Sequence, residues 1–290
     1  MKRYIAGLAC VATAVLSAPA LASTAHAQAV DPITALKSQF SNGRGVSFVD
    51  TTKIQGPQGN AIIAQRKGAF QFGASGVNAS DQTAKLRFKE SDFEGAFGDG
   101  EGDEESRKMI AGLTKPERVI RIKNTTYISG GILGEYLPSD KTWVRVPAGM
   151  LGMTGPLSQS VNVAEPATLK ALLAHATKRG GVYSGKITFG ELSKVSPWFR
   201  ASMAGASTAR TAKRVVTWKL YLGSDQLAER LTTTFSMGSG DEATPMTVDT
   251  RYTGWGARIT VKAPPAEEVA EMKDLGEEAE EATSIPLLGG

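Results

Sequence analysis

Residues 245–265 read Pro-Met-Thr-Val-Asp-Thr-Arg-Tyr-Thr-Gly-Trp-Gly-Ala-Arg-Ile-Thr-Val-Lys-Ala-Pro-Pro. Two runs of alternating side chains flank Tyr252 and Trp255, which stand among glycines, and two prolines end the pattern. Successive side chains of a strand point to opposite faces, so alternation marks strands with one buried and one solvated face. The stretch therefore predicts the closing strands of an antiparallel sheet in a strand-rich domain.

The same alternation recurs along most of the chain. It is found at 66–72, 83–89, 119–129, 144–146, 216–222 and 230–237. Short connections rich in Gly, Pro, Ser and Asp favour sequential hairpins. Apolar residues at helical spacing appear at 31–41, 166–177 and 190–203. Helices that interrupt a series of strands predict an α+β fold, with one curled antiparallel sheet packed over a few helices on its concave side.

Residues 1–27 have the features of a secretory signal peptide. Lys2 and Arg3 precede an apolar run, and the Ala-His-Ala sequence at 25–27 offers the small residues that a signal peptidase reads. A membrane anchor is the alternative, but the run is short and ends in small and polar residues. Cys10, the only cysteine, follows six apolar residues, which is too short a core for a lipidated start. We therefore expect a secreted protein of the cell envelope without an acyl anchor.

The charges are unevenly distributed in a chain whose net charge is +4. Residues 266–290 contain eight acidic residues and one lysine, so the preceding part is basic. A basic domain can contact an anionic membrane surface, whereas no basic stripe with stacking aromatics indicates nucleic-acid binding. We divide the chain into the signal peptide at 1–27, a folded domain at 28–265 and an acidic tail at 266–290. This tail is expected to be helical or disordered and to lie outside the core.

Residues 90–105 form a second acidic stretch, which predicts a mobile loop or hairpin tip. The acids Asp99, Glu101 and Asp103 have the spacing of a calcium loop. Glu104 and Ile110, however, stand where such a loop needs a glycine and a bidentate glutamate. We therefore expect no metal site there.

Little in the expected mature chain points to covalent catalysis. Its one histidine, His175, lies near the end of the helical run 166–177, where a positive group is favoured electrostatically. The sequence contains no Cys/His ligand pattern, nucleophile elbow, phosphate-binding loop or dinucleotide fingerprint. We expect a protein that is not an enzyme, with no catalytic residue, metal or cofactor. An unrecognised hydrolase remains an alternative.

Three stretches resemble bacterial lipoprotein carriers of the LolA type, and are closest in character to the LppX/LprG-like lipid carriers. They are 126–146, which ends in Lys-Thr-Trp-Val-Arg-Val, 216–235, and 245–265. The resemblance implies an incomplete antiparallel β-barrel with a hydrophobic cavity between its concave face and its helices. It also implies that the protein transports lipids or acylated molecules without covalent chemistry. Ala228 stands where the family often has proline, and the acidic tail lies outside the pattern.

The apolar sides of the predicted strands supply the candidate lining of that cavity. The candidates are Phe70, Phe72, Ile120, Ile122, Ile128, Trp218, Leu220 and Phe235. Alternation cannot separate a cavity wall from plain core, since both are apolar. We expect a lipid or acyl-chain ligand, an anionic membrane as a further contact, no nucleic acid, and a monomer. A second hypothesis, from another class, is a periplasmic-type sensor or interaction domain of the same fold that regulates a partner protein.

Overall fold

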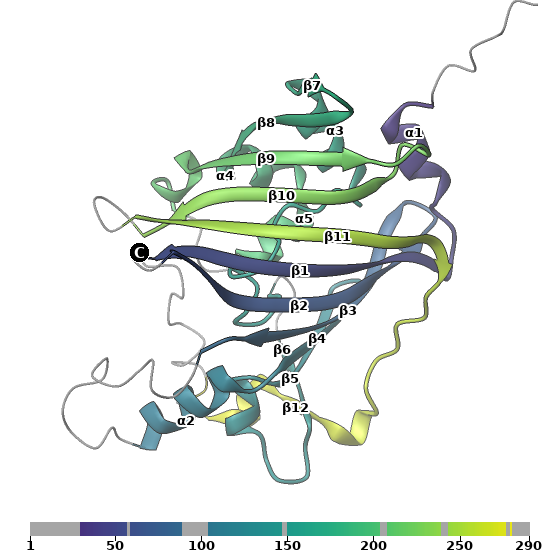
Figure 1. Cartoon of the computed structure of the whole chain (residues 1–290). Coiled ribbons are helices and arrows are strands. Elements are labelled where there is room, and N and C mark those ends of the chain that lie inside the picture. The colour runs from purple at the N-terminus through teal and green to yellow at the C-terminus, as the bar shows by residue number, and fades with distance from the viewer. Residues whose placement is uncertain are drawn as a thin grey trace, which may run out of the picture.

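The computed structural model describes residues 30–56, 59–88, 104–146, 150–203, 208–238, 243–276 and 279. Within these residues one sheet of twelve strands has the order β12-β6-β5-β4-β3-β2-β1-β11-β10-β9-β8-β7. The strands are β1 Arg44–Gly56, β2 Gly59–Gly73, β3 Gly76–Leu86, β4 Glu117–Ile122, β5 Thr125–Gly130, β6 Trp143–Val146, β7 Thr177–Arg179, β8 Val182–Thr188, β9 Val215–Leu222, β10 Ala228–Met237, β11 Thr244–Arg258 and β12 Val269–Glu271. The sheet is curled but not closed (Figure 1), which confirms the α+β class and the incomplete antiparallel barrel.

Two meanders, β1 to β6 and β7 to β11, build this sheet and meet where β1 pairs with β11. Every neighbouring pair is antiparallel except β12 and β6, which are parallel. The helices are α1 Pro32–Ser38, α2 Glu104–Thr114, α3 Pro166–Ala174, α4 Phe189–Val195 and α5 Pro197–Ser202, with 3-10 turns at Leu133–Tyr136, Thr211–Lys213, Ala266–Glu268 and Met272–Leu275. Helices α3, α4 and α5 lie behind the sheet in Figure 1, on its concave side. None of the helices among the described residues is long and apolar enough to cross a membrane.

The local signals for the three predicted helices are confirmed. Asp31 caps α1 by accepting hydrogen bonds from the backbone N–H groups of Ile33 and Thr34. The third predicted helix is divided into α4 and α5. Pro197 is the first residue of α5, and the Ser196 hydroxyl caps this helix by accepting a hydrogen bond from the backbone N–H of Phe199. Helix α2 is not predicted by the sequence, since its first residues fall at the end of the expected acidic loop at 90–105. Residues 89–103 lie outside the described part of the chain.

The predicted strand at 119–129 is wrong, because this stretch is a hairpin of β4 and β5. Lys123 has a φ of +53° and turns the chain, so that Val119 pairs with Ile128 and Ile120 pairs with Tyr127. Directly opposed residues in an antiparallel pair project from the same face. Ile120 therefore lies on the other face of the sheet from Ile128, not on the same face as expected.

The expectation that residues 266–282 lie outside the core is also wrong. Strand β12 pairs with the edge strand β6, and the side chains of Ala270, Leu275 and Ala279 are buried. Glu271 points the other way and pairs with Arg145 at 2.6 Å. Among the described residues of the tail, the acidic side chains of Glu267, Glu268, Glu271 and Asp274 are partly or fully exposed, while Ala270 and Leu275 between and beside them extend the core. The count of charges gave no sign of this alternation.

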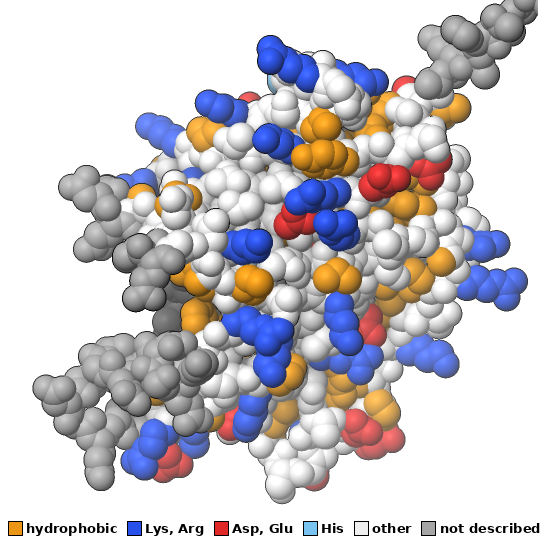
Figure 2. Space-filling view, viewed as in Figure 1, with side chains coloured by type: hydrophobic (Ala, Val, Ile, Leu, Met, Phe, Trp, Pro, Cys, Tyr) orange, Lys and Arg blue, Asp and Glu red, His pale blue; other side chains and the backbone are white. Residues whose placement is uncertain are grey.

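The outer face of the sheet is polar and largely basic. Lys53, Lys67, Lys219 and Arg251 project from it and are exposed. Figure 2 shows Lys and Arg side chains spread across this face, with few acidic side chains among them. The concave and outer faces therefore offer very different surfaces to a ligand.

Candidate functional site

Six of the eight predicted lining residues belong to one hydrophobic core beneath the concave face. These six, all buried, are Phe70, Phe72, Ile128, Trp218, Leu220 and Phe235. Trp198 of α5 packs edge-on against Phe70 with ring centroids 4.9 Å apart, and Phe189 of α4 packs against Phe235 at 5.3 Å. The structure therefore brings these six together, but places Ile120 and Ile122 on the outer side of β4.

A segment without regular secondary structure covers the middle of this face. Residues 151–164 connect the β6 side of the molecule to α3, and all are buried except Pro156, which is half-buried. Buried backbone groups need hydrogen-bond partners even where no sheet or helix supplies them. Within the described part of the chain, some of these partners lie in the segment itself: the backbone N–H groups of Gly155, Leu157, Ser158 and Glu165 donate to carbonyl oxygens of residues 152–162. The N–H of Leu151 donates to the Ala201 oxygen of α5. We call residues 151–165 the cover segment.

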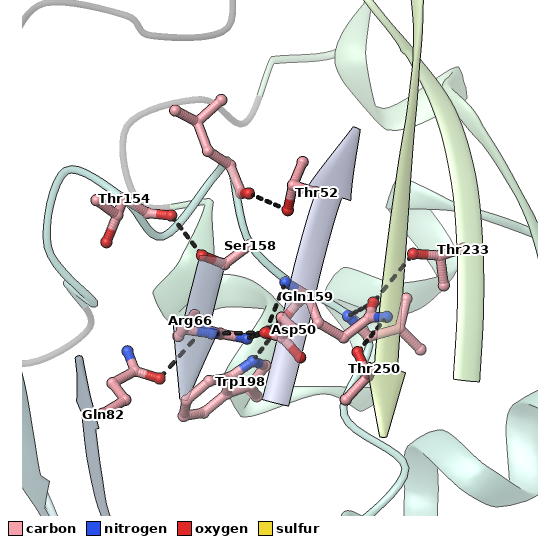
Figure 3. Close-up of polar contacts among 12 residues, drawn as sticks. Asp50, Thr52, Arg66, Gln82, Thr154, Ser158, Gln159, Trp198, Thr233 and Thr250 are labelled. Carbon is pink, nitrogen blue, oxygen red and sulfur yellow. Dashed lines mark hydrogen bonds and ion pairs between the residues drawn. The ribbon is translucent and has the colours of Figure 1, made fainter. Parts of the chain in front are cut away.

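Buried polar side chains of the sheet hold the cover segment in place. Arg66 on β2 donates from Nε to Asp50 Oδ2 on β1 at 2.6 Å, and its Nη2 also pairs with that oxygen. The same guanidinium donates to Gln82 Oε1 at 3.1 Å and to the backbone oxygen of Gln159 at 3.1 Å (Figure 3). Its Cζ atom lies over the Phe48 ring, 5.1 Å from the ring centroid. Such a buried charge pair is tolerable only because nearly every donor has an acceptor.

Gln159 is the central contact of the cover segment (Figure 3). Its side-chain amide donates to Thr250 Oγ1 at 3.0 Å, and its Oε1 accepts from Thr233 Oγ1 at 3.1 Å. Its backbone oxygen also accepts from the indole of Trp198 at 3.0 Å. One glutamine therefore joins β10, β11 and α5, in addition to the Arg66 contact from β2.

Two further buried carboxylates hold the ends of the cover segment. Glu117 on β4 accepts from the backbone N–H groups of Met153 and Thr154, each at 3.0 Å. Glu165 accepts from the backbone N–H of Trp198 at 2.9 Å and from the Ser196 hydroxyl. Burial raises the pKa of both carboxyls above the ordinary value, because the charged form loses hydration there.

The charged side chains around the cover segment have structural partners. The described residues form no group of three His, Cys, Asp or Glu side chains that could hold a metal ion. The buried carboxylates face backbone amides and hydroxyls of the cover segment and its neighbours, which gives them a structural role. What the site offers is an apolar sheet face under a cover attached through polar side chains.

One feature of the sequence, which apolar periodicity does not detect, indicates this cover. No charged residue occurs from Pro147 to Ala164, although charged residues are frequent on either side. A long uncharged stretch that is neither helical nor alternating is a mark of irregular buried chain. Its polar partners Asp50 and Arg66 gave no signal, because a charge in a strand usually marks the solvated face.

No protein-family profile and no curated protein matches the chain. Among solved structures it is similar to a hypothetical protein from Chlamydia trachomatis, with 9% identity, a TM-score of 0.31, and 81% of this chain and 98% of that chain covered. A LolA superfamily protein from Nitrosomonas europaea matches at 5% identity and a TM-score of 0.26, covering 81% of this chain and 93% of that one. A domain from Vibrio parahaemolyticus, described as an outer membrane lipoprotein-sorting protein, matches at 7% identity and a TM-score of 0.28, with 77% and 90% covered.

Proteins of the LolA type, which the sequence motifs resemble, are thus among the similar solved structures. At these identities and TM-scores, the similarity assigns neither a ligand nor the role of any residue. Function has to come from the residues of the site.

Proposed function

We propose that this protein is a non-enzymatic carrier of the cell envelope that binds a lipid or acylated molecule on the concave face of its sheet. The observation behind the proposal is the way in which this face is covered. The face is apolar over β9 and β10, with a polar cluster around Asp50 and Arg66 at its centre, and the cover segment is joined to the sheet by side-chain hydrogen bonds such as Thr52 Oγ1 to the Leu157 oxygen at 2.7 Å. A cover of this kind can be displaced without breaking the sheet.

The energetics favour exchange of the cover for an acyl chain. Each methylene moved out of water contributes about 0.8 kcal/mol, so ten methylenes contribute about 8 kcal/mol. The chain would take over the apolar contacts of Trp218, Leu220 and Phe235, so that these side chains never face water. The cost lies in releasing the polar contacts of Gln159, whose groups find water once the cover moves, and in uncovering apolar side chains of the cover itself, such as Leu157 and Val161.

The rest of the molecule fits a role at a membrane. The basic outer face would be attracted to anionic headgroups and so would bring the protein to a membrane surface. A signal peptide at residues 1–27, which lie outside the described part of the chain, would deliver the protein to the envelope. Membrane attraction through the basic face and export by the signal peptide are both part of the proposed function.

Quenching of tryptophan fluorescence by a brominated fatty acid tests the acyl-chain site directly. Bromine quenches an indole only at contact, and Trp218 lies on the concave face whereas Trp143 lies on the outer face. We expect the brominated acid to quench the wild-type protein, the Trp143→Phe variant to keep that quenching, and the Trp218→Phe variant to lose a large part of it. Because Trp198 lies in the same core, packed against Phe70, a Trp198→Phe variant is compared as well. Quenching that neither Trp218→Phe nor Trp198→Phe reduces would show that the chain does not lie beneath the sheet.

Mass spectrometry of the purified protein distinguishes the remaining alternatives. Co-purified acyl species support the carrier. A stable complex with another envelope protein and no acyl species would favour the interaction domain, and turnover of an ester substrate would favour a hydrolase. Either of the last two results, together with absent quenching, would overturn the carrier function.

A further inference from the structure

A pocket of about 340 Å³ lies beside the concave face, where β3 and β4 meet the end of the cover segment and the starts of α3 and α5. This volume is within the range of roughly 300–1,000 Å³ in which small molecules bind. None of the eight predicted lining residues borders it. Trp198 in its wall packs against Phe70, so the pocket adjoins the acyl-chain face but has a polar lining of its own.

Four polar atoms of residues that line this pocket are buried and lack a hydrogen-bond partner among the described residues. They are Asn78 Oδ1, Ser80 Oγ, Arg121 Nε and Asn162 Nδ2. Ser80 is 1% exposed and Asn162 is 2% exposed. Buried polar groups are almost always hydrogen-bonded, so four around one pocket point to a ligand that supplies their partners.

The orientation of these groups follows from their neighbours. Ser80 and Arg121 are directly paired across β3 and β4, and so project side by side from the concave face. The Oδ1 atom of Asn162 accepts from the backbone N–H of Ala164 at 2.9 Å, which leaves its Nδ2 donor for the pocket. Three donors from three separate segments therefore border one space, and Asn78 Oδ1 adds an acceptor.

The pocket also contains a cation without an ion-pair partner. Among the described residues, no carboxylate lies within 4 Å of the Arg121 guanidinium, and Lys123 adds a second positive charge to the rim. Glu165, the acid in the lining, attracts the Arg121 charge, but its carboxylate oxygens accept from the Thr168 and Ser196 hydroxyls and the Trp198 backbone N–H. Burial lowers the pKa of Arg121, which means that its charge is poorly solvated. An anionic ligand would restore that solvation.

We propose that this pocket binds the phosphate group of a small phosphate ester. A phosphate presents several terminal oxygens that can accept from Arg121, Ser80 and Asn162 together, and a neighbouring hydroxyl of the ester can donate to Asn78. Val77, Val195 and Pro197 form apolar walls that fit a short carbon skeleton. The ester is either a free metabolite or the headgroup of a lipid, and the chemistry of recognition is the same. The site does not depend on acyl-chain binding under the sheet.

Calorimetric titration with three probes tests the site: glycerol 3-phosphate, dihexanoyl phosphatidic acid and, as the uncharged control, glycerol. We expect at least one phosphate probe to bind and glycerol not to bind. Equal affinity for both phosphate probes assigns the site to free phosphate esters, whereas much tighter binding of the lipid assigns it to a headgroup. Absence of binding by both phosphate probes overturns the proposal, whatever the brominated fatty acid shows.

Two matched variants on β4 locate the binding. Arg121→Gln removes the charge that faces the pocket and should weaken phosphate binding by roughly tenfold to a hundredfold. Arg118→Gln removes a charge from the outer face of the same strand, where Arg118 pairs with Asp81 at 2.7 Å, and should change the affinity less than about twofold. Ligand-free Arg121→Gln should remain folded and melt close to the wild type, because Arg121 is half-buried and forms no ion pair within 4 Å in the described part of the chain. Equal affinity in the two variants would contradict this pocket as the binding site.

Discussion

Replacement of Arg66 by methionine should be among the most destabilising single changes in the domain. The side chains of Arg66 and Asp50 are 3% and 1% exposed, so the pair is almost fully withdrawn from water. Arg66 donates to Asp50, Gln82 and the Gln159 backbone, and these acceptors would lose that donor. The Gln159 oxygen would keep only its bond from the Trp198 indole, and the Asp50 carboxylate would lose its cation. Asp50 already has one oxygen, Oδ1, without a partner among the described residues. Removing one member of a buried pair costs about 3–5 kcal/mol, because the other charge remains buried alone.

The loss is measurable in two ways. Denaturant unfolding should give the difference of about 3–5 kcal/mol directly, and the melting temperature should fall by roughly 6–20 °C for a domain of this size. Hydrogen exchange in the cover segment should accelerate more than in β9 or β10, because Arg66 holds the Gln159 backbone. The second measurement tests the specific claim that this polar cluster attaches the cover.

Two companion variants control the interpretation. Arg230→Met breaks the Arg230–Asp249 pair on the outer face and should cost less than about 1 kcal/mol, since that pair is partly solvated. The double variant Asp50→Leu with Arg66→Met removes both buried charges and should recover most of the loss. A cost below about 1 kcal/mol for Arg66→Met, or a double variant no more stable than the single one, would refute the reasoning.

Three further predictions concern the ends of the cover and the apolar face. Burial raises the pKa of Glu117, so the folded state binds its proton more tightly than the unfolded state does, and the Glu117 contribution favours folding less as the pH rises above about 4.5. The stability of wild type relative to Glu117→Gln should therefore fall between pH 4 and pH 7, and a constant difference would contradict the shift. Gly152→Ala should cost more than about 1 kcal/mol in denaturant unfolding, because Gly152 has a φ of +73° and its Cβ would lie 2.3 Å from Glu117 Oε1. Unchanged stability would show that the backbone of this end of the cover segment is not packed tightly against Glu117. Leu220→Asp should abolish binding of a fluorescent fatty acid, whereas Lys219→Asp, on the opposite face of β9, should retain it. Melting curves must show that both are folded, and a folded Leu220→Asp protein that binds like wild type would exclude this face.

The sequence by itself determined the class of the fold and much of its core. Alternation along β9 and β10 was enough to place Trp218, Leu220 and Phe235 on a buried face, because a strand offers only two sides and one of them was polar. The cap at Asp31 and the break at Pro197 were equally readable, since capping and proline geometry act within one turn of chain.

Only the tertiary structure decided which polar groups are buried. Asp50 and Thr52 occupy the inward positions of the central strand β1, which hid that strand from a reading of apolar alternation. Their burial depends on partners distant in the chain, since Gln159 lies 109 residues beyond Asp50. The polar lining of the phosphate pocket, from Asn78 to Asn162, depends in the same way on contacts between separate elements.

The face of the sheet that each side chain occupies also depends on contacts that local sequence does not encode. Ile120 was assigned to the wrong face because one turn at Lys123 reverses the chain, and alternation continues across a tight turn without recording it. The parallel pairing of β12 with β6 joins residues whose positions differ by 126, and no local pattern encodes it. Periodicity describes how side chains alternate along one strand. Which side becomes the inside, and which buried charge finds a partner, depends on strand pairing and packing between distant segments.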